Sequence, residues 1–413
     1  MLAGCFGSGS WLCLLASRGL SRCSQDIVLA DEIDCRRGDD CPACSSQDSV
    51  ALPIPSGDSS VLSDGRIMPR SLDKVGCCAC GLVRHRVPLS PAEVAAIYAE
   101  NYELPAQSSL ADNARGEAYA RVVAGAIGGI PGLGRLLEIG CGSGATARFL
   151  ARMLPVHEIR GVDPALPDEF LGTSGKVTLA RGLLEDQAGP AWRHFDAVVS
   201  INTIEHTPDP AGFLAAIAAR LRPSGKAVVI CPVAVPANCE LLFFDHLWTF
   251  SPAAFHAFAA AAGLRVTETL ALDGALACFQ GFVMEKGGGA SEPGAAANPD
   301  DAARYLAAWQ ELDGLWCDRL DTLGGRVQIF GAGQMAAVIR AYAPRTWART
   351  ERLVVDNPAD AWDLGRVERY VPEDHVHGYR TIVAVNPLAK EAVAARIRRD
   401  GGEPLVMPDA IQF

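Results

Sequence analysis

A predicted strand that leads directly into a glycine turn and then a helix constrains this chain more than any other feature. Residues 136–144 read LLEIGCGSG, an apolar run followed by three glycines at alternating positions. Glycine lets the backbone turn sharply and approach a ligand closely, and the N-terminus of the next helix offers free amide donors. The pattern predicts a ligand-binding turn in an α/β protein. Glycine turns that bind NAD look similar, so the turn alone does not identify the ligand.

Short apolar runs alternate with amphipathic segments after this turn. Such alternation is typical of a doubly wound parallel sheet covered by helices. Serine caps followed by proline mark two further helices, one before the turn and one after the last strand. The expected strands are 135–139, 159–162, 197–201 and 227–231, and the expected helices are 91–98, 145–153, 211–221 and 251–262.

Polar residues follow the ends of these strands, at the sheet edge where open α/β proteins bind ligands. Asp163 ends the second strand about twenty residues after the glycines, where a carboxylate can accept hydrogen bonds from both ribose hydroxyls. Glu205 and His206 lie just past the strand expected at 197–201 and could contact a substrate. The alternative is that Glu205 begins a helical turn and His206 is a partly buried structural imidazole.

With these segments in place, the sequence resembles the class I S-adenosylmethionine-dependent methyltransferases. The resemblance rests on EIGCGSG at 138–144, Asp163, IEHTPDP at 204–210 and LRPSG at 221–225. It implies eight cofactor contacts: Glu138, Gly140, Gly142 and Gly144 beside the methionine moiety, Asp163 at the ribose, Leu184 and Glu185 at the adenine, and Asn202 on the methyl-donor side. For Leu184, plain core packing is an equal alternative.

Two C-x2-C pairs lie near the N-terminus, with 32 residues between them. The surrounding segment is too poor in long apolar runs to build a core alone, and a structural zinc site would supply folding energy. The predicted ligands are Cys41, Cys44, Cys77 and Cys80. Cys78 allows a second register, and the gap is longer than in the commonest zinc ribbons. Buried apolar cysteines or a redox pair are the alternatives.

A stretch rich in glycine, alanine and proline, GGGASEPGAAANP at 287–299, predicts a linker. A second α/β unit follows this linker. Beyond it we expect helices at 301–323 and 336–343 and strands at 327–330, 352–355 and 381–385. The turn FGAGQMA at 330–336, with Asp356 at the end of the next strand, fits a dinucleotide fingerprint. An NAD-binding oxidoreductase module and a Rossmann-like unit without a ligand both remain open.

The order of these parts resembles the nucleotide-sugar C-methyltransferases over about residues 41–413, and a wider group with the same front end over 41–284. In the sugar enzymes a Tyr-x-Glu-His segment supplies a histidine base that removes a proton beside a ketone, and the C-terminal unit helps to hold the nucleotide. The matching stretch here is FFDHLWTF at 243–250. The resemblance therefore puts His246 at the base position.

Two departures from that family are visible. Phe243 stands at the tyrosine position without a hydroxyl, and LDGAL at 272–276 replaces a His-Gly-Gly-Ser motif. Asp245 replaces the family's glutamate, and we expect it to orient the His246 imidazole and raise its basicity. A histidine can accept a proton near neutral pH, which suits methylation at carbon, oxygen or nitrogen. The alternative role for His246 is a hydrogen bond within a loop over the pocket.

Charge and cysteine placement limit the partners. A net charge of −11 argues against broad capture of nucleic acid or anionic lipid, which both need basic surface. Cysteines outside the two pairs are scattered, which favours a reducing, cytoplasmic setting. The apolar run near the N-terminus is too short for a membrane span, and nothing in the sequence sets the oligomeric state.

The sequence thus predicts an α/β protein with a Rossmann-like class I methyltransferase core, a small zinc-binding N-terminal module and a C-terminal Rossmann-like domain. The expected parts are a disordered leader at 1–37, the zinc module at 38–90, the methyltransferase domain at 91–285, a linker at 286–300 and the C-terminal domain at 301–413. The predicted function is S-adenosylmethionine-dependent methyl transfer to a small molecule, with C-methylation of a nucleotide-linked keto sugar as the narrower prediction. O- or N-methylation of another small acceptor is the alternative.

Overall fold

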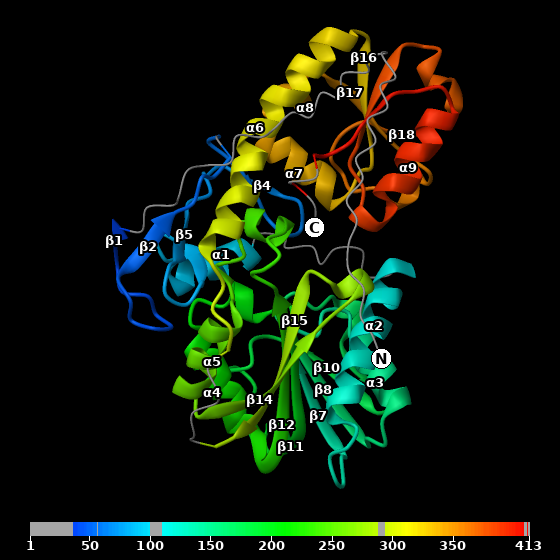
Figure 1. Cartoon of the computed structure of the whole chain (residues 1–413). Coiled ribbons are helices and arrows are strands. Elements are labelled where there is room, and N and C mark those ends of the chain that lie inside the picture. Colours follow the sequence, from blue (N-terminus) through cyan, green and yellow to red (C-terminus); the bar gives the residue numbers. More distant parts are fainter. Residues whose placement is uncertain (1–35, 56, 100–109, 288–293, 409–410, 412–413) are drawn as a thin grey trace, which may run out of the picture.

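An eight-stranded sheet forms the centre of the larger lobe (Figure 1). The computed structural model describes residues 36–55, 57–99, 110–287, 294–408 and 411. The leader predicted at 1–37 lies outside the described residues, apart from 36 and 37. The strands of the sheet, in spatial order, are β14 (Leu264–Ala271), β15 (Phe279–Lys286), β12 (Leu221–Pro232), β11 (Phe195–Ile201), β7 (Arg135–Ile139), β8 (Glu158–Asp163), β10 (Val177–Arg181) and β9 (Gly172–Ser174).

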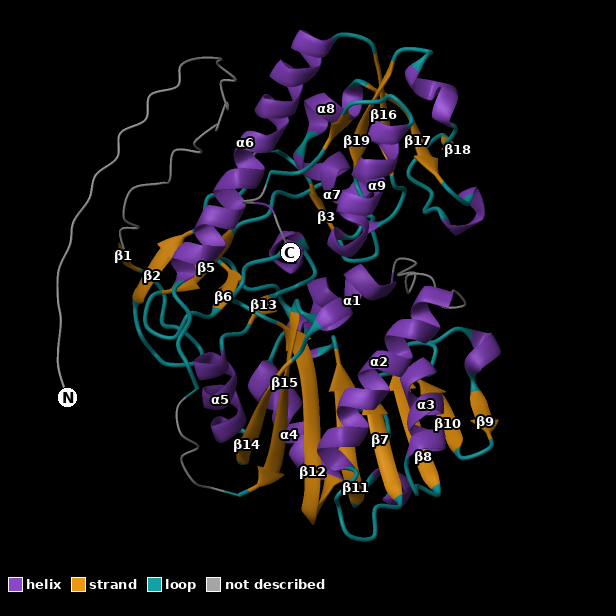
Figure 2. Cartoon of the chain, turned by 45° about the vertical axis from the view of Figure 1, so that its right-hand side comes forward, coloured by secondary structure: helices purple, strands orange, loops and turns teal. Residues whose placement is uncertain are grey.

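The strands from β12 to β10 pair in parallel, and β15 runs antiparallel between β12 and β14. Parallel sheets need cover on both faces, which is why their strands are apolar almost throughout. Along β11, Ala197 and Val199 pack with α2 (Leu110–Ile127) and α3 (Ala145–Met153), whereas Val198 packs with α4 (Pro210–Arg220) and α5 (Pro252–Ala261). Figure 2 shows the two helix pairs on opposite faces. The predicted Rossmann-like fold is confirmed.

The helix starts follow their local chemistry. Asp209 caps α4 by accepting a hydrogen bond from the Gly212 amide, and Ser251 caps α5 in the same way from Ala254. In both helices proline occupies the first turn, where its missing N–H leaves no hydrogen bond unmade. The short helix α1 (Pro91–Ala99) begins where its serine and proline predicted.

The N-terminal module is a small antiparallel sheet that shares a strand with the core. Its order is β1 (Arg36–Arg37), β2 (Asp48–Ala51), β5 (Lys74–Cys77), β6 (Val83–His85) and β13 (Trp248–Thr249), and a separate hairpin pairs β3 (Ser60–Val61) with β4 (Ile67–Met68). Since β13 comes from the segment after β12, the module is built onto the loop that carries His246.

The C-terminal unit is a five-stranded parallel sheet in the order β18 (Val367–Arg369), β17 (Thr350–Val355), β16 (Arg326–Phe330), β19 (Tyr379–Val383) and β20 (Pro404–Leu405). Its helices are α6 (Pro299–Leu323), α7 (Gln334–Tyr342), α8 (Pro344–Ala348) and α9 (Pro387–Arg399). The strand expected at 381–385 begins and ends two residues earlier.

The C-terminal part of the predicted linker, residues 294–300, is described by the structure and packs against its neighbours. The Ala253 amide donates to the Ala295 carbonyl at 3.2 Å, and a Cβ on Gly81 would collide with the backbone of Ala297. Within the part of the chain described, no helix is both long and apolar enough to cross a membrane.

Candidate functional site

The glycine turn after β7 has the backbone geometry that the sequence predicted. Gly140, Gly142 and Gly144 all adopt positive φ angles, 72°, 51° and 79°. A side chain at Gly140 would collide with Thr203, and a Cβ at Gly144 would lie 2.5 Å from Leu179 Cδ1. Only glycine meets both conditions without strain, because other residues rarely adopt this left-handed conformation.

Asp163, at the end of β8, faces the same turn. Its Oδ2 accepts a hydrogen bond from the Gly142 amide at 2.9 Å, and its Oδ1 accepts one from Ala165 at 2.8 Å. Burial raises the pKa of Asp163, while the two amides oppose that shift. Each carboxylate oxygen has further lone pairs, so Asp163 can accept a hydrogen bond from a ligand hydroxyl in addition to those from the two amides. The ribose contact stays a prediction.

Two buried acceptors beside this turn lack a partner within the described residues. Glu138, on β7, has an unpaired Oε2, and burial raises its pKa to about 8. Asn202 follows β11 with a φ of 50°; its Nδ2 donates to Tyr119 Oη at 2.9 Å, and its Oδ1 has no partner. Buried polar atoms are normally paired, so these two are open to a ligand. The sequence prediction missed Tyr119 because it contained no helix at α2.

The two residues predicted at the adenine differ in their surroundings. Leu184 is buried with the core residues, and Glu185 is exposed. The geometry of Leu184 is what plain packing requires, so the adenine contact of both residues stays a prediction.

A second group of polar side chains lies past the same sheet edge. Glu205 and His206 belong to the 3-10 turn η3 (Ile204–His206), and His246 comes from the segment after η4 (Cys239–Leu242). One side-chain ligand atom of each residue lies within 4.8 Å of the others. The sequence prediction thus named three residues that the fold brings together.

Glu205 is fully buried, and neither of its carboxylate oxygens has a hydrogen-bond partner among the residues that the structure describes. Burial raises its pKa well above the usual range, with Glu240 and Asp245 adding to the shift. Its surroundings therefore favour the protonated, uncharged form of the carboxyl group.

The two imidazoles meet edge to face, with ring centroids 4.6 Å apart. His206 Nδ1 lies 2.9 Å from the Asp245 carbonyl oxygen. Since a carbonyl only accepts, His206 carries a proton on Nδ1. Burial lowers the pKa of His246 well below its usual value, so this ring is neutral at physiological pH.

The expected role of Asp245 as the orienting partner of His246 is wrong. The Asp245 carboxylate accepts hydrogen bonds from the Ser63 amide at 2.8 Å and the Ser63 hydroxyl at 2.6 Å, and the nearer ring is His206, at 3.6 Å. Asp245 and His246 are adjacent in the sequence, but their side chains contact different residues. The basicity of His246 is also lowered rather than raised, because burial dominates. Phe243 is buried, with its ring centroid 5.1 Å from that of His246.

The N-terminal module holds the segment around His246. Lys74 Nζ donates to the carbonyls of Phe243 at 3.3 Å and His246 at 3.1 Å, and burial lowers the pKa of Lys74 to about 7. The Phe244 amide donates to Val61 at 2.8 Å. Nothing in the sequence indicated that Lys74 holds this segment, because its hydrogen-bond partners are backbone carbonyls far along the chain.

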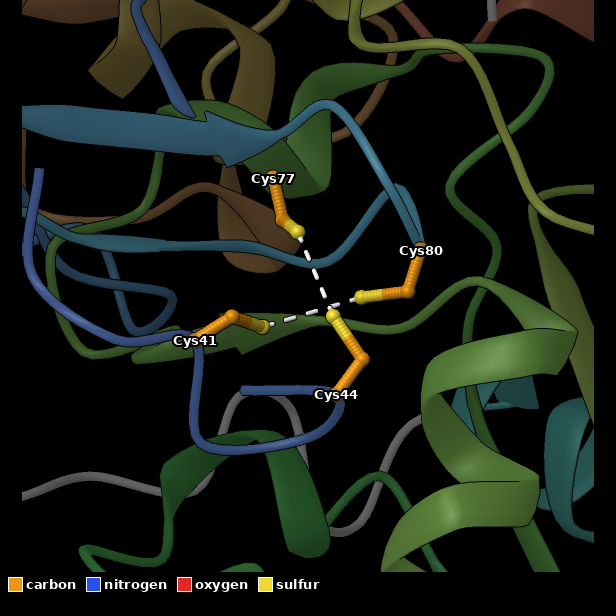
Figure 3. Close-up of side chains that lie close together, drawn as sticks. All are labelled: Cys41, Cys44, Cys77 and Cys80. Atoms are coloured by element: carbon orange, nitrogen blue, oxygen red, sulfur yellow. Dashed lines mark hydrogen bonds between the residues drawn. The ribbon is translucent and has the colours of Figure 1, made fainter. Parts of the chain in front are cut away.

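The four predicted cysteines converge (Figure 3). The sulfurs of Cys41 and Cys80 are 3.7 Å apart, and those of Cys44 and Cys77 are 3.6 Å apart. Zn–S bonds of about 2.3 Å in a tetrahedral site place the sulfurs about 3.8 Å apart. The cluster therefore has the spacing of a four-thiolate metal site, and it contains Cys77 rather than Cys78.

The glycine turn of the C-terminal unit differs from the first turn in its backbone, because Gly333 has a φ of −131°, and in its polar surroundings. Gly331 has a φ of 121°, and a side chain there would collide with the Ala384 carbonyl. Asp356 is exposed and accepts a hydrogen bond from Arg396 at 2.7 Å. The carboxylate predicted to hold a ribose is thus paired within the unit.

Comparison with known proteins identifies the central part of the chain. Residues 111–269 match a family model described as "Methyltransferase domain". A ubiquinone biosynthesis O-methyltransferase of Aeromonas salmonicida (strain A449) is 34% identical over 103 residues, which cover 23% of this chain and 42% of that protein. One of Alkalilimnicola ehrlichii is 31% identical over 112 residues, covering 26% and 44%. The chain therefore spans less than half the length of these relatives.

Solved structures are similar to part of the chain as well. A Burkholderia thailandensis 1,6-didemethyltoxoflavin-N1-methyltransferase is 21% identical, with coverage of 51% of this chain and 96% of that chain and a TM-score of 0.39. The mitomycin 7-O-methyltransferase MmcR is 15% identical, with coverage of 43% and 54% and a TM-score of 0.35. Over residues 111–269 the chain is thus similar to methyltransferase domains, in agreement with its Rossmann-like sheet.

Proposed function

We propose that this protein transfers a methyl group from S-adenosylmethionine to a small molecule, with the cofactor seated on the turn at Gly140–Gly144. The observation that carries the proposal is the convergence of three left-handed glycines, Asp163 and Asn202 at one sheet edge. S-adenosylmethionine carries an ammonium and a sulfonium group. The unpaired acceptors on Glu138 and Asn202 fit such a cation-bearing ligand.

The bound cofactor supplies an electrophilic methyl group, and the protein supplies alignment and proton transfer. Proximity and orientation carry much of the barrier reduction in such a reaction. His246 accepts the proton of the methyl acceptor, and its low pKa keeps the ring unprotonated for that step. Glu205 and His206 lie beside it and contact the acceptor.

The acceptor is a nucleotide-linked keto sugar, methylated at the carbon beside the ketone. Support comes from His246 at the position of the sugar enzymes' base and from the Rossmann-like C-terminal unit. The relatives named O-methyltransferases support an oxygen acceptor instead. Both chemistries need one proton acceptor beside the methyl donor, so the site is compatible with either.

A single zinc ion held by Cys41, Cys44, Cys77 and Cys80 completes the proposal. The sulfur spacings support a tetrahedral four-thiolate site. The metal has a structural role, because four thiolates leave no open position for a substrate.

A mass-spectrometric screen tests the acceptor class. The full-length protein is incubated with S-adenosylmethionine and three sets of acceptors: nucleotide-linked keto sugars, phenols and primary amines. Addition of one methyl group to the sugars alone is the expected result. Methylation of phenols without any sugar product would replace the acceptor by an oxygen nucleophile and leave methyl transfer in place.

The second candidate function is dinucleotide binding by the C-terminal unit, favoured by the Gly331 turn. Because Asp356 is already paired with Arg396, we expect the full-length protein to bind a nucleoside-diphosphate sugar and not NADH. Titration with both ligands checks this. Tight NADH binding that Asp356→Asn weakens, with no sugar-nucleotide binding, would favour the oxidoreductase-type module.

A further inference from the structure

Glu240 lies against the presumed proton acceptor, although the sequence did not single it out. It belongs to η4, is 8% exposed, and places Oε2 3.2 Å from His246 Nδ1. The two atoms are at ion-pair distance, but their orientation falls short of a hydrogen bond, since His246 Nδ1 has no hydrogen-bond partner in the described part of the chain. Hydrogen bonds in catalytic sites are often poorly aligned until a substrate binds, and a small rotation of either side chain would complete this one.

Glu205 also lies near this ring, with a carboxylate oxygen within 4.8 Å of a ring nitrogen, but among the described residues the ion-pair contact of His246 is with Glu240. The remaining neighbours of His246 cannot take the role of Glu240. His206 and Phe243 contact the His246 ring edge to face, and neither offers it a carboxylate. Lys74 contacts only the His246 backbone carbonyl, and the Asp245 carboxylate is bound by Ser63. Within the described part of the chain, Glu240 is the acidic side chain at ion-pair distance from this ring.

We propose that Glu240 is the positioning residue of His246: its carboxylate accepts the Nδ1 proton and leaves Nε2 free to take a proton from the methyl acceptor. The tautomer of a histidine is set by the hydrogen bond that its other ring nitrogen makes. In serine hydrolases a buried carboxylate fixes the tautomer of the catalytic histidine in this way. The catalytic part of the inference rests on the proposed function, whereas the tautomer does not.

The surrounding charges make the arrangement depend on pH. Burial raises the pKa of Glu240 to about 7; Asp245 adds to the shift, and Arg115 on α2 and Lys74 on β5 oppose it. His246 faces His206 from η3 and Lys74 from β5, and both lower its pKa further. Above about pH 7 Glu240 is a carboxylate that can only accept, so the proton sits on Nδ1. Below that pH the carboxylic acid donates to Nδ1, and the ring proton moves to Nε2.

Nitrogen NMR of histidine-labelled, metal-loaded, full-length protein tests the tautomer without any acceptor. The His246 signals are identified by their loss in His246→Gln. We expect a proton on Nδ1 at pH 8 and a shift towards the Nε2 tautomer on titration through pH 7. Glu240→Gln abolishes that titration because an amide does not ionise, and the exposed Glu311→Gln leaves it intact.

A proton on Nε2 at pH 8 would overturn the inference, as would an unchanged titration in both Glu240→Gln and Glu240→Ala. Once an acceptor is known, Glu240→Gln should lower kcat on the order of a hundredfold, with unchanged cofactor affinity and no rate change near pH 7. If the tautomer behaves as expected while His246→Gln retains full kcat, the proposed role of His246 as proton acceptor fails, methyl transfer stands, and Glu240 keeps only its effect on the tautomer.

Discussion

Removing the metal from the four-cysteine cluster is expected to abolish methyl transfer by unfolding the N-terminal module and loosening the segment at 243–249. A structural zinc site contributes about 10–16 kcal/mol of apparent binding free energy. A whole domain is stable by only about 5–15 kcal/mol. The module has no large core of its own, and it supplies Lys74, Val61 and the β6 edge that hold this segment.

Metal analysis and hydrogen exchange check this expectation together. Purified protein should contain about one zinc per chain for a four-thiolate site, and Cys77→Ser should lose it. Amides of β5, β6 and β13 should then exchange quickly, while those of β7 and β11 stay protected. Cys317→Ser, at a buried cysteine on α6, is the matched control. A metal-free wild type with slow exchange in β5 and β6 would contradict the zinc site.

Replacing His246 by glutamine is expected to lower turnover about a hundredfold or more and to leave cofactor affinity nearly unchanged. Loss of a positioned base typically has that cost, and the glycine turn does not contact this ring. The matched control is His157→Gln, because His157 is exposed just before β8, at the opposite end of the sheet. Near-normal turnover in His246→Gln would reduce His246 to a structural residue, and lost cofactor binding would indicate a disturbed fold.

The same site predicts a rate that rises with pH through about pH 7. His246 has a pKa well below its usual value and is neutral throughout this range, so its own titration does not produce the rise. Glu240, with a pKa raised to about 7, loses its proton there and frees His246 Nε2. A kcat/KM that is flat between pH 6 and 8 would contradict this assignment.

Local signals in the sequence were sufficient for the parts of the fold that depend on near neighbours. The strand Arg135–Ile139 and the helix Ala145–Met153 have the predicted bounds, because a glycine turn separates them and packing covers both. The caps at Ser251 and Ser90 were also readable from residues a few positions apart.

Non-local contacts account for what the sequence did not reveal. The strands β14 and β15 were missed because their place beside β12 depends on pairing far along the chain. Lys74 was missed because its partners, Phe243 and His246, lie far along the chain. Glu240 is close to His246 in sequence, and it was missed because no sequence pattern marks the turn that brings the two side chains together. The error over Asp245 has the same origin: adjacency in sequence did not make it the nearest carboxylate to the ring.

Calorimetric titration of the metal-loaded, full-length protein with S-adenosylmethionine tests the central claim most directly. Wild type should bind one cofactor per chain, and Asp163→Ala should weaken binding about 10- to 100-fold, the equivalent of the 1.5–3 kcal/mol of a charge-assisted hydrogen bond. Circular dichroism establishes that both proteins are folded. Folded wild type that takes up no S-adenosylmethionine would contradict the account.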